Sequence, residues 1–450
     1  MNAIPQLARL GLFDARVPRY TSYPTAPQFS AAIGAEAAAG WIAAIPAGAA
    51  ISLYVHVPFC RQLCWFCACR TQGTSSEAPV QAYLEVLLAE LRLIAAHLPA
   101  GVRLARLHWG GGTPTLMTAP MIARLAGAIR DLAPFAPGAE FSVEIDPNEI
   151  DEARLDALAA AGMNRASIGV QDFDPAIQKT IGRIQSHALT AQVAGMIRAR
   201  GVHSLNADIL YGLPDQTPAR IATSVEKLIA LSPDRVALYG YAHVPWMARR
   251  QQLIPSDALP TPEERLELFE TAAALFRDAG YQAIGIDHFA RPGDGLARAA
   301  RDGRLRRNFQ GYTDDTAPIL LGVGASSISR FPQGYAQNAP ATSDHIRAIR
   351  AGRLSTQRGH AFAGEDVWRS RIIEALMCDF HVDLAEIRAM GADPERLAAA
   401  CAACAAAFPG MVELTGVALA IPDLARPLTR MIARSFDAYD PGTARHSIAI

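Results

Sequence analysis

The chain contains very little lysine. Lys179 and Lys227 are the only lysines among 42 lysine and arginine residues, and 43 acidic residues balance these to a formal net charge of -1. A chain without net positive charge has no general attraction to nucleic acid or to an anionic membrane surface. No apolar run is long enough to cross a bilayer, and the first twenty residues lack the apolar core of a signal peptide. We therefore expect a cytoplasmic protein whose partners include neither nucleic acid nor a membrane.

Cysteine is also sparse, but it is unevenly distributed. Four of the seven cysteines lie in the segment CRQLCWFCAC (60–69), directly after the apolar run ISLYVHVPF. A loop that leaves a strand can wrap closely spaced thiolates around an iron-sulfur cluster, because soft sulfur ligands suit iron. The alternatives are a tetrahedral zinc site and four unrelated thiols, although zinc sites more often pair two separated cysteine knuckles.

Short runs rich in β-forming residues alternate along the chain with alanine-rich stretches of helical character. This alternation predicts βαβ units in an α/β fold with a parallel sheet, either open or closed into a barrel. In both architectures the chemistry lies at the carboxyl ends of the strands. The predicted strands cover residues 51–57, 104–111, 141–146, 165–170, 204–212 and 235–241, and residues 282–290 resemble one more strand.

The chain is predicted to have three regions. We expect an N-terminal arm over residues 1–48, a barrel with its extension over residues 49–340, and a small C-terminal helical domain over residues 360–450. Proline and glycine in the stretch from about 340 to 360 indicate a linker. Cys401 and Cys404 lie in an alanine-rich segment with no other ligand types nearby, which favours a packing role over a redox or metal role.

Glycines and isolated polar residues mark the ends of the predicted strands. The segment HWGGGTPT has three consecutive glycines, which permit positive φ and a close approach of the backbone to a ligand. Glu144, Gln171 and Asp208 lie at the ends of otherwise apolar strands, and a buried polar group needs a partner. A ligand with an amine and ribose hydroxyls would provide partners, and structural hydrogen bonds at the rim are the alternative.

The C-x3-C-x2-C spacing resembles the cluster loop of radical S-adenosylmethionine (SAM) enzymes. This resemblance implies that Cys60, Cys64 and Cys67 bind three irons of a 4Fe-4S cluster. The fourth iron would chelate the methionine end of S-adenosylmethionine, and Cys69 would not be a ligand. The fold implied is a partial (β/α)6 TIM-like barrel of the radical SAM type.

A longer series of motifs is similar to one family, the oxygen-independent coproporphyrinogen III oxidases. These motifs occur in the family order and run from about residue 17 to beyond residue 380: RYTSYPTA, YVHVPFC, CWFCAC, HWGGGTPT, SVEIDP, GVQDF, DILYGLPDQT, DHFARP and NFQGY. The resemblance implies cofactor contacts through Tyr54, Phe66, Gly111, Gly112, Thr113, Glu144, Gln171, Arg183, Asp208 and Ala242, with Ile328 near a second cofactor region. One or two molecules of S-adenosylmethionine would bind.

The activity implied by the resemblance is a step of porphyrin and haem biosynthesis. A 5′-deoxyadenosyl radical would abstract a hydrogen from each of two propionates of coproporphyrinogen III, and loss of carbon dioxide and one further electron would leave the vinyl groups of protoporphyrinogen IX. A flavodoxin or ferredoxin would donate the electron to a monomeric enzyme. The alternatives are a haem-binding chaperone and a haem-degrading radical SAM relative. The fourth cysteine and the NFQGY segment favour the oxidase.

A tetracarboxylate substrate requires arginines at the barrel mouth, because guanidinium groups form charge-assisted hydrogen bonds with carboxylates. Near the family motifs, Arg19, Arg249, Arg250, Arg291 and Arg307 are candidates, each with a solvated surface role as its alternative. Phe309 and Gln310 lie in a motif that the family places near the active site. The arm segment RYTSYPTA is expected to fold over the barrel mouth.

Overall fold

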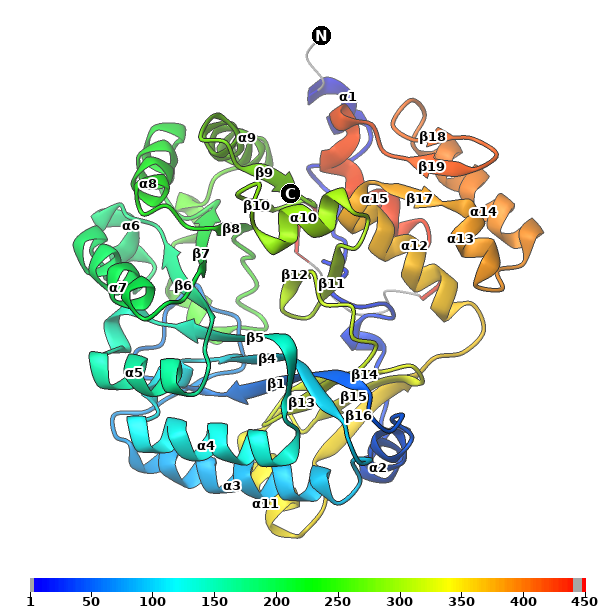
Figure 1. Cartoon of the computed structure of the whole chain (residues 1–450). Coiled ribbons are helices and arrows are strands. Elements are labelled where there is room, and N and C mark those ends of the chain that lie inside the picture. The colour runs from blue at the N-terminus through cyan, green and yellow to red at the C-terminus, as the bar shows by residue number, and fades with distance from the viewer. Residues whose placement is uncertain (1–3, 440–446) are drawn as a thin grey trace.

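The centre of the protein is a twelve-stranded sheet whose six middle strands are parallel and curve into a partial barrel (Figure 1). The computed structural model describes residues 4–439 and 447–450, so residues 1–3 of the predicted arm and 440–446 of the predicted C-terminal domain lie outside the described residues. The predicted α/β fold is confirmed. The six parallel strands are β1 (Ala50–Val57), β4 (Arg103–Gly111), β5 (Phe135–Ile145), β6 (Arg165–Gln171), β7 (Ser204–Tyr211) and β8 (Arg235–Gly240).

Helices cover the outer face of the barrel strands. Their apolar sides and the outward side chains of the strands form one continuous core, as the amphipathic pattern of the helices requires. The covering helices are α3 (Ala78–Ala95), α4 (Ala119–Leu132), α5 (Glu152–Ala160), α7 (His187–Ala199), α8 (Pro218–Ala230) and α9 (Pro262–Asp278). The short helix α6 (Pro175–Thr180) packs instead in a smaller apolar cluster with Leu213 and Tyr241. Among the described helices, none is long and apolar enough to span a bilayer.

The inner face of the barrel is polar. On β5, Phe141 and Val143 join the outer core, whereas Ser142 and Glu144 line an inner cavity. On β7 the same alternation places Asp208 inside. Side chains alternate between the two faces of a strand, so a polar residue at every second position gives a sheet with one apolar and one polar face.

Further strands extend both edges of the central sheet, and all of them except β13 join it by antiparallel pairing. β13 (Leu320–Val323) pairs in parallel with β1 and is followed by β14 (Ile328–Phe331), β15 (Gly334–Asn338) and β16 (Thr356–Ala361). The opposite edge carries β10 (His288–Ala290) and β9 (Gln282–Ile284). The prediction of one strand over 282–290 was wrong, because the chain reverses at Gly285, where φ is 52°.

The predicted linker near 340–360 was also wrong. This stretch contains helix α11 (Thr342–Arg350) and strand β16, which belong to the barrel extension. Pro340 precedes the helix and Gly352, with φ of 71°, follows it. Proline before a helix and glycine after it are ordinary helix boundaries, so the two residues mark the ends of an element rather than a break between domains.

The C-terminal region is mostly helical and also contains a small three-stranded sheet. It comprises α12 (Asp366–Asp379), β17 (His381–Asp383), α13 (Leu384–Ala389), α14 (Pro394–Ala407), β18 (Glu413–Leu414), β19 (Ala418–Ala420) and α15 (Thr429–Arg434). Leu7, Phe13 and Tyr20 of the N-terminal arm complete its apolar core. Cys401 and Cys404 are buried in the same core, which agrees with a packing role.

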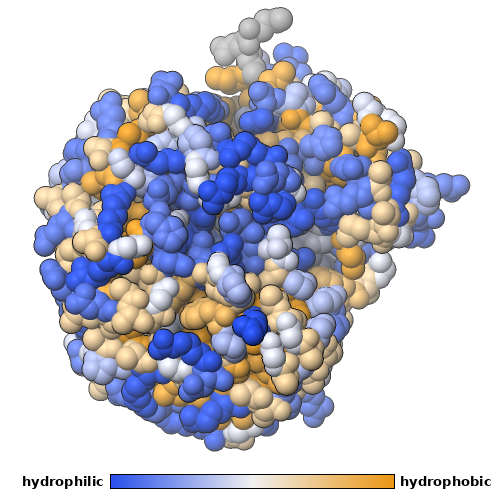
Figure 2. All heavy atoms as spheres, viewed as in Figure 1, coloured by the Kyte–Doolittle hydropathy of each residue, from blue (hydrophilic) through white to orange (hydrophobic). Residues whose placement is uncertain are grey.

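Short elements connect these parts. They are α1 (Ile4–Arg9), α2 (Ala35–Ala43), β2 (Phe59–Cys60), β3 (Gln72–Gly73), α10 (Gly295–Arg301), β11 (Arg306–Asn308) and β12 (Gly311–Thr313). Asp294 begins α10 and accepts a hydrogen bond from Arg235 Nε at 2.6 Å, which holds α10 against the amino end of β8. On the face shown in Figure 2, hydrophilic side chains gather over α10 and around it.

At this amino end of the barrel, three arginines surround Glu140. Arg165 Nη1 donates to Glu140 Oε1 at 3.0 Å, and the guanidinium groups of Arg106 and Arg235 lie 3.6 and 4.0 Å from Oε2. Burial by itself would raise the pKa of Glu140, but the three positive charges outweigh it and lower the pKa to about 2. The carboxylate therefore stays charged and compensates the arginines that close the barrel.

Glu140→Gln should destabilise the protein, because Arg165 loses its carboxylate partner in a buried position, while Arg106 and Arg235 keep Asp314 and Asp294. We expect the free energy of unfolding in urea at pH 7 to fall by about 2–4 kcal/mol. The matched control is Glu85→Gln, which removes an exposed ion pair to Arg124 and should change stability little.

The effect of Glu140→Gln should also depend on pH. Folding lowers the pKa of Glu140 from 4.5 to about 2, so its stabilisation is complete above pH 4.5 and is lost as the pH falls toward 2. The stability difference between wild type and variant should shrink over that interval. Equal losses of stability in Glu140→Gln and Glu85→Gln at pH 7 would contradict this role. A stability difference between wild type and Glu140→Gln that grows as the pH falls would also contradict it.

Candidate functional site

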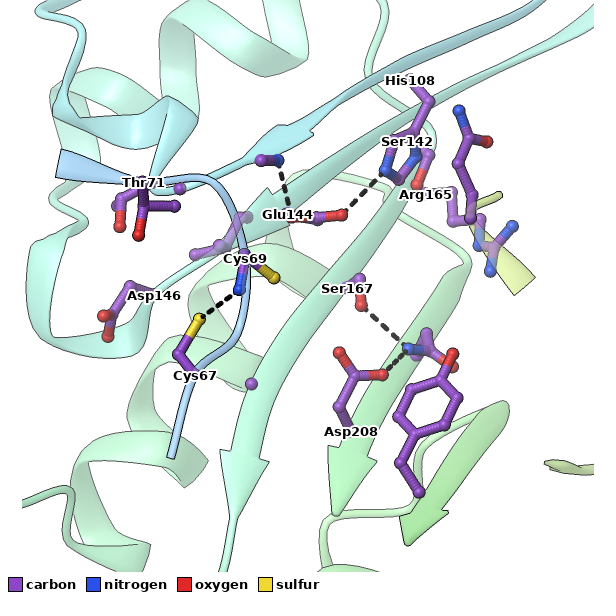
Figure 3. Close-up of a pocket in the computed structure, with 18 of the residues that line it drawn as sticks. Cys67, Cys69, Thr71, His108, Ser142, Glu144, Asp146, Arg165, Ser167 and Asp208 are labelled. Carbon is purple, nitrogen blue, oxygen red and sulfur yellow. Dashed lines mark hydrogen bonds and ion pairs between the residues drawn. The ribbon is translucent and has the colours of Figure 1, made fainter. Parts of the chain in front are cut away.

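A cavity of about 350 Å³ runs through the inside of the barrel. Its wall at the carboxyl ends of the strands is built from the cysteine loop, the glycine turn after β4, and the ends of β5 to β7 (Figure 3). Of the residues predicted to bind the cluster or the cofactor, this cavity is lined by Cys60, Cys64, Phe66, Cys67, Gly111, Gly112, Thr113, Glu144, Gln171, Arg183 and Asp208. Residues from five separate strand ends are thus brought to one place.

Three of the predicted cofactor residues do not line this cavity. Tyr54 stacks on His108, which does line the cavity, with ring centroids 5.7 Å apart. Ala242 contributes its carbonyl oxygen to a hydrogen bond from Gln251 Nε2 at 3.0 Å, and the same amide donates to Phe66 O at 2.7 Å. Ile328 lies in β14, in the extension of the sheet. Tyr54 can influence the cavity through His108, and Ala242 can do so through its carbonyl group.

The glycine turn packs directly against the cysteine loop. Gly112 N donates to Val57 O at 2.8 Å and Thr113 N donates to Phe59 O at 2.7 Å. A Cβ atom on Gly112 would lie 2.5 Å from Phe59 O and 3.0 Å from Cys60 Sγ, closer than side-chain atoms normally approach. Gly111 has a φ of 110°, which favours glycine. The sequence GGG therefore allows the two loops to touch.

Glu144 is held in the cavity wall by two hydrogen bonds. His108 Nε2 lies 3.2 Å from Oε1, and Gly111 N donates to Oε2 at 3.1 Å (Figure 3). Burial would raise the pKa of this carboxyl, but the contacts with His108 and Gly111 outweigh burial and lower the pKa. A negative charge therefore faces the cavity beside the glycine turn, where it can attract an amine.

Asp208 provides a second carboxyl on the inner face. Asn206 Nδ2 donates to both Asp208 Oδ1 and Ser167 Oγ at 2.8 Å (Figure 3). Burial raises the pKa of Asp208 to about 6, against the opposing hydrogen bond from Asn206. Gln171, at the end of β6, has a φ of 68°, which non-glycine residues adopt at a cost and which turns its side chain into the cavity wall.

The three predicted ligand cysteines have different neighbours. Arg183 Nη1 lies 3.6 Å from Cys64 Sγ, and Cys69 N donates to Cys67 Sγ at 3.4 Å. Burial raises the pKa of Cys60 to about 11 and raises that of Cys64, where Arg183 opposes it. A hydrogen bond from Cys69 lowers the pKa of Cys67. Cation and N–H contacts of this kind stabilise thiolates, the form that binds iron.

These residues fit an iron-sulfur cluster better than a single ion. Within the described residues, no three histidine, cysteine, aspartate or glutamate side chains are grouped closely enough to hold one metal ion. A cluster needs only one thiolate for each iron, so its ligands can stand farther apart. Ser142 Oγ, Arg165 Nε and Arg183 Nε are buried in the wall without a hydrogen-bond partner, which suits a polar cofactor beside the cluster.

Of the other predicted residues, some line the cavity and some lie outside it. Gln310 lines the cavity, whereas Phe309 packs against Tyr335 with ring centroids 5.7 Å apart. Arg250 lines the cavity and donates to Cys69 O at 3.1 Å. Placing Arg291 at the barrel mouth was wrong, because it follows β10, which runs back toward the amino end of the barrel, and it donates to Pro233 O there.

Sequence reasoning missed several side chains of this site. His108 was treated only as part of the glycine motif, yet it is the main partner of Glu144. Ser142, Ser167 and Asn206 also line the cavity. The signal was present as polar residues at every second position of four consecutive strands, a pattern that marks the inner face once the strands are known to be parallel.

The comparisons with known proteins agree with this geometry. Residues 54–228 match the family described as the Radical SAM superfamily. The chain is 69% identical to an oxygen-independent coproporphyrinogen III oxidase of Paracoccus denitrificans, over 100% of both chains. It is 40% identical to the Escherichia coli relative with the same name, over 85% of this chain and 83% of the relative.

A solved structure is similar along most of the chain. It is the coproporphyrinogen III oxidase from Escherichia coli, described as a radical SAM enzyme, with a TM-score of 0.89 and 37% identity. The similarity covers 95% of this chain and 100% of that chain. The predicted radical SAM fold is confirmed.

Gly112→Ala should disturb the cysteine loop, since the added methyl group would meet Phe59 O and Cys60 Sγ. We expect at least a twofold lower iron content per chain after anaerobic reconstitution, with little change in the thermal transition. Gly127→Ala is the matched control: it lies in α4, has nothing within 4 Å of the new methyl group, and should bind iron as wild type does. Equal iron contents in the two variants would contradict the close packing of these loops.

Proposed function

Because the chain belongs to the family of oxygen-independent coproporphyrinogen III oxidases, we propose that it converts coproporphyrinogen III to protoporphyrinogen IX. It is a radical SAM oxidoreductase, with a 4Fe-4S cluster and S-adenosylmethionine as cofactors. The reaction oxidatively decarboxylates two propionates to vinyl groups without oxygen, in haem and porphyrin biosynthesis. The observation that carries the proposal is the meeting of the cysteine loop, the glycine turn and Glu144 in one cavity.

In this proposal Cys60, Cys64 and Cys67 hold the cluster, and Cys69 supports Cys67 without binding iron. When bound, the cluster and S-adenosylmethionine supply a 5′-deoxyadenosyl radical that removes a propionate hydrogen. The contact between Arg183 and Cys64 favours the thiolate form and also fixes the loop, because Arg183 donates to both carboxylate oxygens of Asp146 at 3.1 Å.

The remaining side chains position the cofactor. Glu144 and the turn of Gly111, Gly112 and Thr113 face the end of the cavity nearest the cysteines and would orient the amine of the methionine. Gln171 and Asp208 lie farther along the wall, where ribose hydroxyls would find acceptors. Walls of rigid strands keep these groups in place before the cofactor binds, so little of the binding energy is lost in ordering them.

Three further assignments complete the proposal. Tyr54 orients His108 by stacking, and Ala242 acts through its carbonyl group beside Phe66. Ile328 would adjoin a second molecule of S-adenosylmethionine. A flavodoxin or ferredoxin would deliver electrons to a monomeric enzyme in the cytoplasm. The three regions, residues 1–48, 49–340 and 360–450, remain a prediction about domains.

The roles of the last two loop cysteines can be separated by serine substitution. Cys67→Ser should lose the visible absorbance of the cluster and most of its iron after anaerobic reconstitution, because a ligand is removed. Cys69→Ser, the matched control two residues away, should keep both. A loss of iron in Cys69→Ser equal to that in Cys67→Ser would make Cys69 a ligand and contradict the assignment.

The activity is tested with cluster-reconstituted protein under anaerobic conditions, with reductant, S-adenosylmethionine and coproporphyrinogen III. We expect protoporphyrinogen IX, read as protoporphyrin after oxidation, in step with 5′-deoxyadenosine, both resolved by chromatography. Formation of 5′-deoxyadenosine without decarboxylated product would overturn the substrate and leave a radical enzyme of another kind. Neither product from a protein that binds haem tightly would favour a haem chaperone.

A further inference from the structure

A second and larger cavity, of about 950 Å³, lies beside the barrel. It is bounded by α9 and the turn between β9 and β10 on the barrel side, and by the segment that leads into α15 on the C-terminal side (Figure 1). Leu7 and Arg19 of the N-terminal arm also contribute to its wall. The side chain of His288 lines both this cavity and the cofactor cavity, so the two spaces are neighbours.

Six arginines line this second cavity. Arg277 and Arg426 pair with exposed carboxylates, and the other four are Arg19, Arg265, Arg307 and Arg430. Arg19 and Arg430 are bonded to peptide oxygens, and Arg265 is bonded to a peptide oxygen and to the last residue, Ile450. Arg19 Nη2 donates to Gly240 O at 2.7 Å, and Arg265 donates to Gly212 O at 3.4 Å and to Ile450 O at 3.2 Å. Arg430 donates to Pro18 O at 3.1 Å and to Ala449 O at 2.9 Å. These bonds fix the guanidinium groups, and the peptide oxygens leave the charges of Arg19 and Arg430 uncompensated.

Arg307 has an even less complete set of partners. It is 9% exposed, and its Nε and Nη1 have no hydrogen-bond partner. Its Nη1 lies 3.9 Å from Asp287 Oδ1, and within the described residues this is the only ion pair made by the four arginines. Asp287 is itself bonded to His288 Nδ1 at 2.6 Å. Among the described side chains, Asp287 is therefore the one carboxylate paired with any of these four arginines, and it already has a partner.

Three of the other acidic residues of this cavity have partners of their own, and all five are exposed: Glu263, Glu264, Glu267, Glu270 and Asp423. Glu270 pairs with Arg277 and Asp423 pairs with Arg426. Glu264 accepts a hydrogen bond from Thr261 N in the capping box of α9. Burial lowers the pKa of Arg430 to about 9, and the neighbouring charges of Arg19 and Arg307 add to this shift. The charges of Arg19, Arg307 and Arg430 therefore repel one another, and Asp287 offsets this repulsion in part.

The remaining wall is apolar and aromatic. Phe269, Ile286, Phe289 and Phe380 contribute to it. A cavity of this size with apolar walls and a few converging charged groups has the properties of a site for a large organic ligand. The arrangement suits a ligand with an uncharged, flat or cupped ring system and several carboxylates at its edge.

We propose that this cavity binds the substrate tetrapyrrole, with Arg19, Arg265, Arg307 and Arg430 holding the carboxylates of propionates that are not reacting. One remaining propionate would extend past His288 into the cofactor cavity. This inference rests on the proposed function, because it takes the ligand to be a tetracarboxylic porphyrinogen. Planar guanidinium groups bind carboxylates with two parallel hydrogen bonds, so fixed arginines would also select the ring orientation.

The test uses the full-length, cluster-loaded protein and two single variants, Arg19→Gln and Arg265→Gln. Binding is measured by fluorescence titration with coproporphyrin III, the air-stable oxidised form of the substrate, at low and at high salt. We expect the dissociation constant of each variant to rise about tenfold at low salt, with a smaller difference at high salt. Arg19→Lys, which keeps the charge, should recover part of the affinity.

Arg198→Gln is the matched control, because Arg198 also donates only to peptide oxygens, at 2.9 and 2.6 Å, but lies in α7 away from the cavity. It should bind coproporphyrin III as wild type does. Iron content and the thermal transition report whether each variant is folded. Arg430 is left unchanged, because its bonds to the arm and to residues 448–449 hold the C-terminal region together.

Turnover of coproporphyrinogen III separates this proposal from the assigned reaction. In the two cavity variants KM should rise about tenfold, with a smaller change in kcat, because the arginines hold carboxylates that do not react. Unchanged dissociation constants and KM values in both variants, with active wild type, would overturn the cavity assignment and leave the function in place. A wild type that binds coproporphyrin III through these arginines but converts no coproporphyrinogen III would overturn the function and keep the binding site.

Discussion

The barrel depends on the compensation of charge inside a β-sheet. Parallel strands that are covered on both faces are usually apolar throughout, whereas the inner-face residues of β4 to β7 are mostly polar. Such a face is stable only when its charges have partners, because an unpaired buried charge costs several kcal/mol. Glu140 and its three arginines meet this requirement at the amino end. In the cavity wall, Ser142 Oγ and Arg183 Nε have no hydrogen-bond partner, and a cofactor would supply one.

The candidate site is rigid because its parts hold one another. The glycine turn is bonded to the strand end that leads into the cysteine loop, and Glu144 is bonded to the same turn. His108 fixes the other oxygen of Glu144 and is fixed in turn by Tyr54. A displacement of any one of these groups would move the others, so the polar groups of the candidate site are held in place before any ligand arrives.

Much of this site could be predicted from the sequence, because its main signals are local. The cysteine spacing, the three glycines and the strand-end residues Glu144, Gln171 and Asp208 all lie next to apolar runs that identify the strands. His108 was missed because its importance comes from a residue on the next strand, 36 positions away. The hairpin at Gly285 and the helix α11 were missed because glycine and proline mark both the ends of elements and the gaps between them.

The pairing of the arm with the C-terminal region has a consequence for biosynthesis. Arg430 holds Val17 and Pro18 on one side and Ile448 and Ala449 on the other. The ribosome makes the arm first, but the arm cannot reach its final position until these late residues have been synthesised. The six barrel strands and the cysteine loop are complete some two hundred residues earlier, at Gly240. The arm and helix α15 can therefore take their final places against the barrel only after the last residues of the chain have been made.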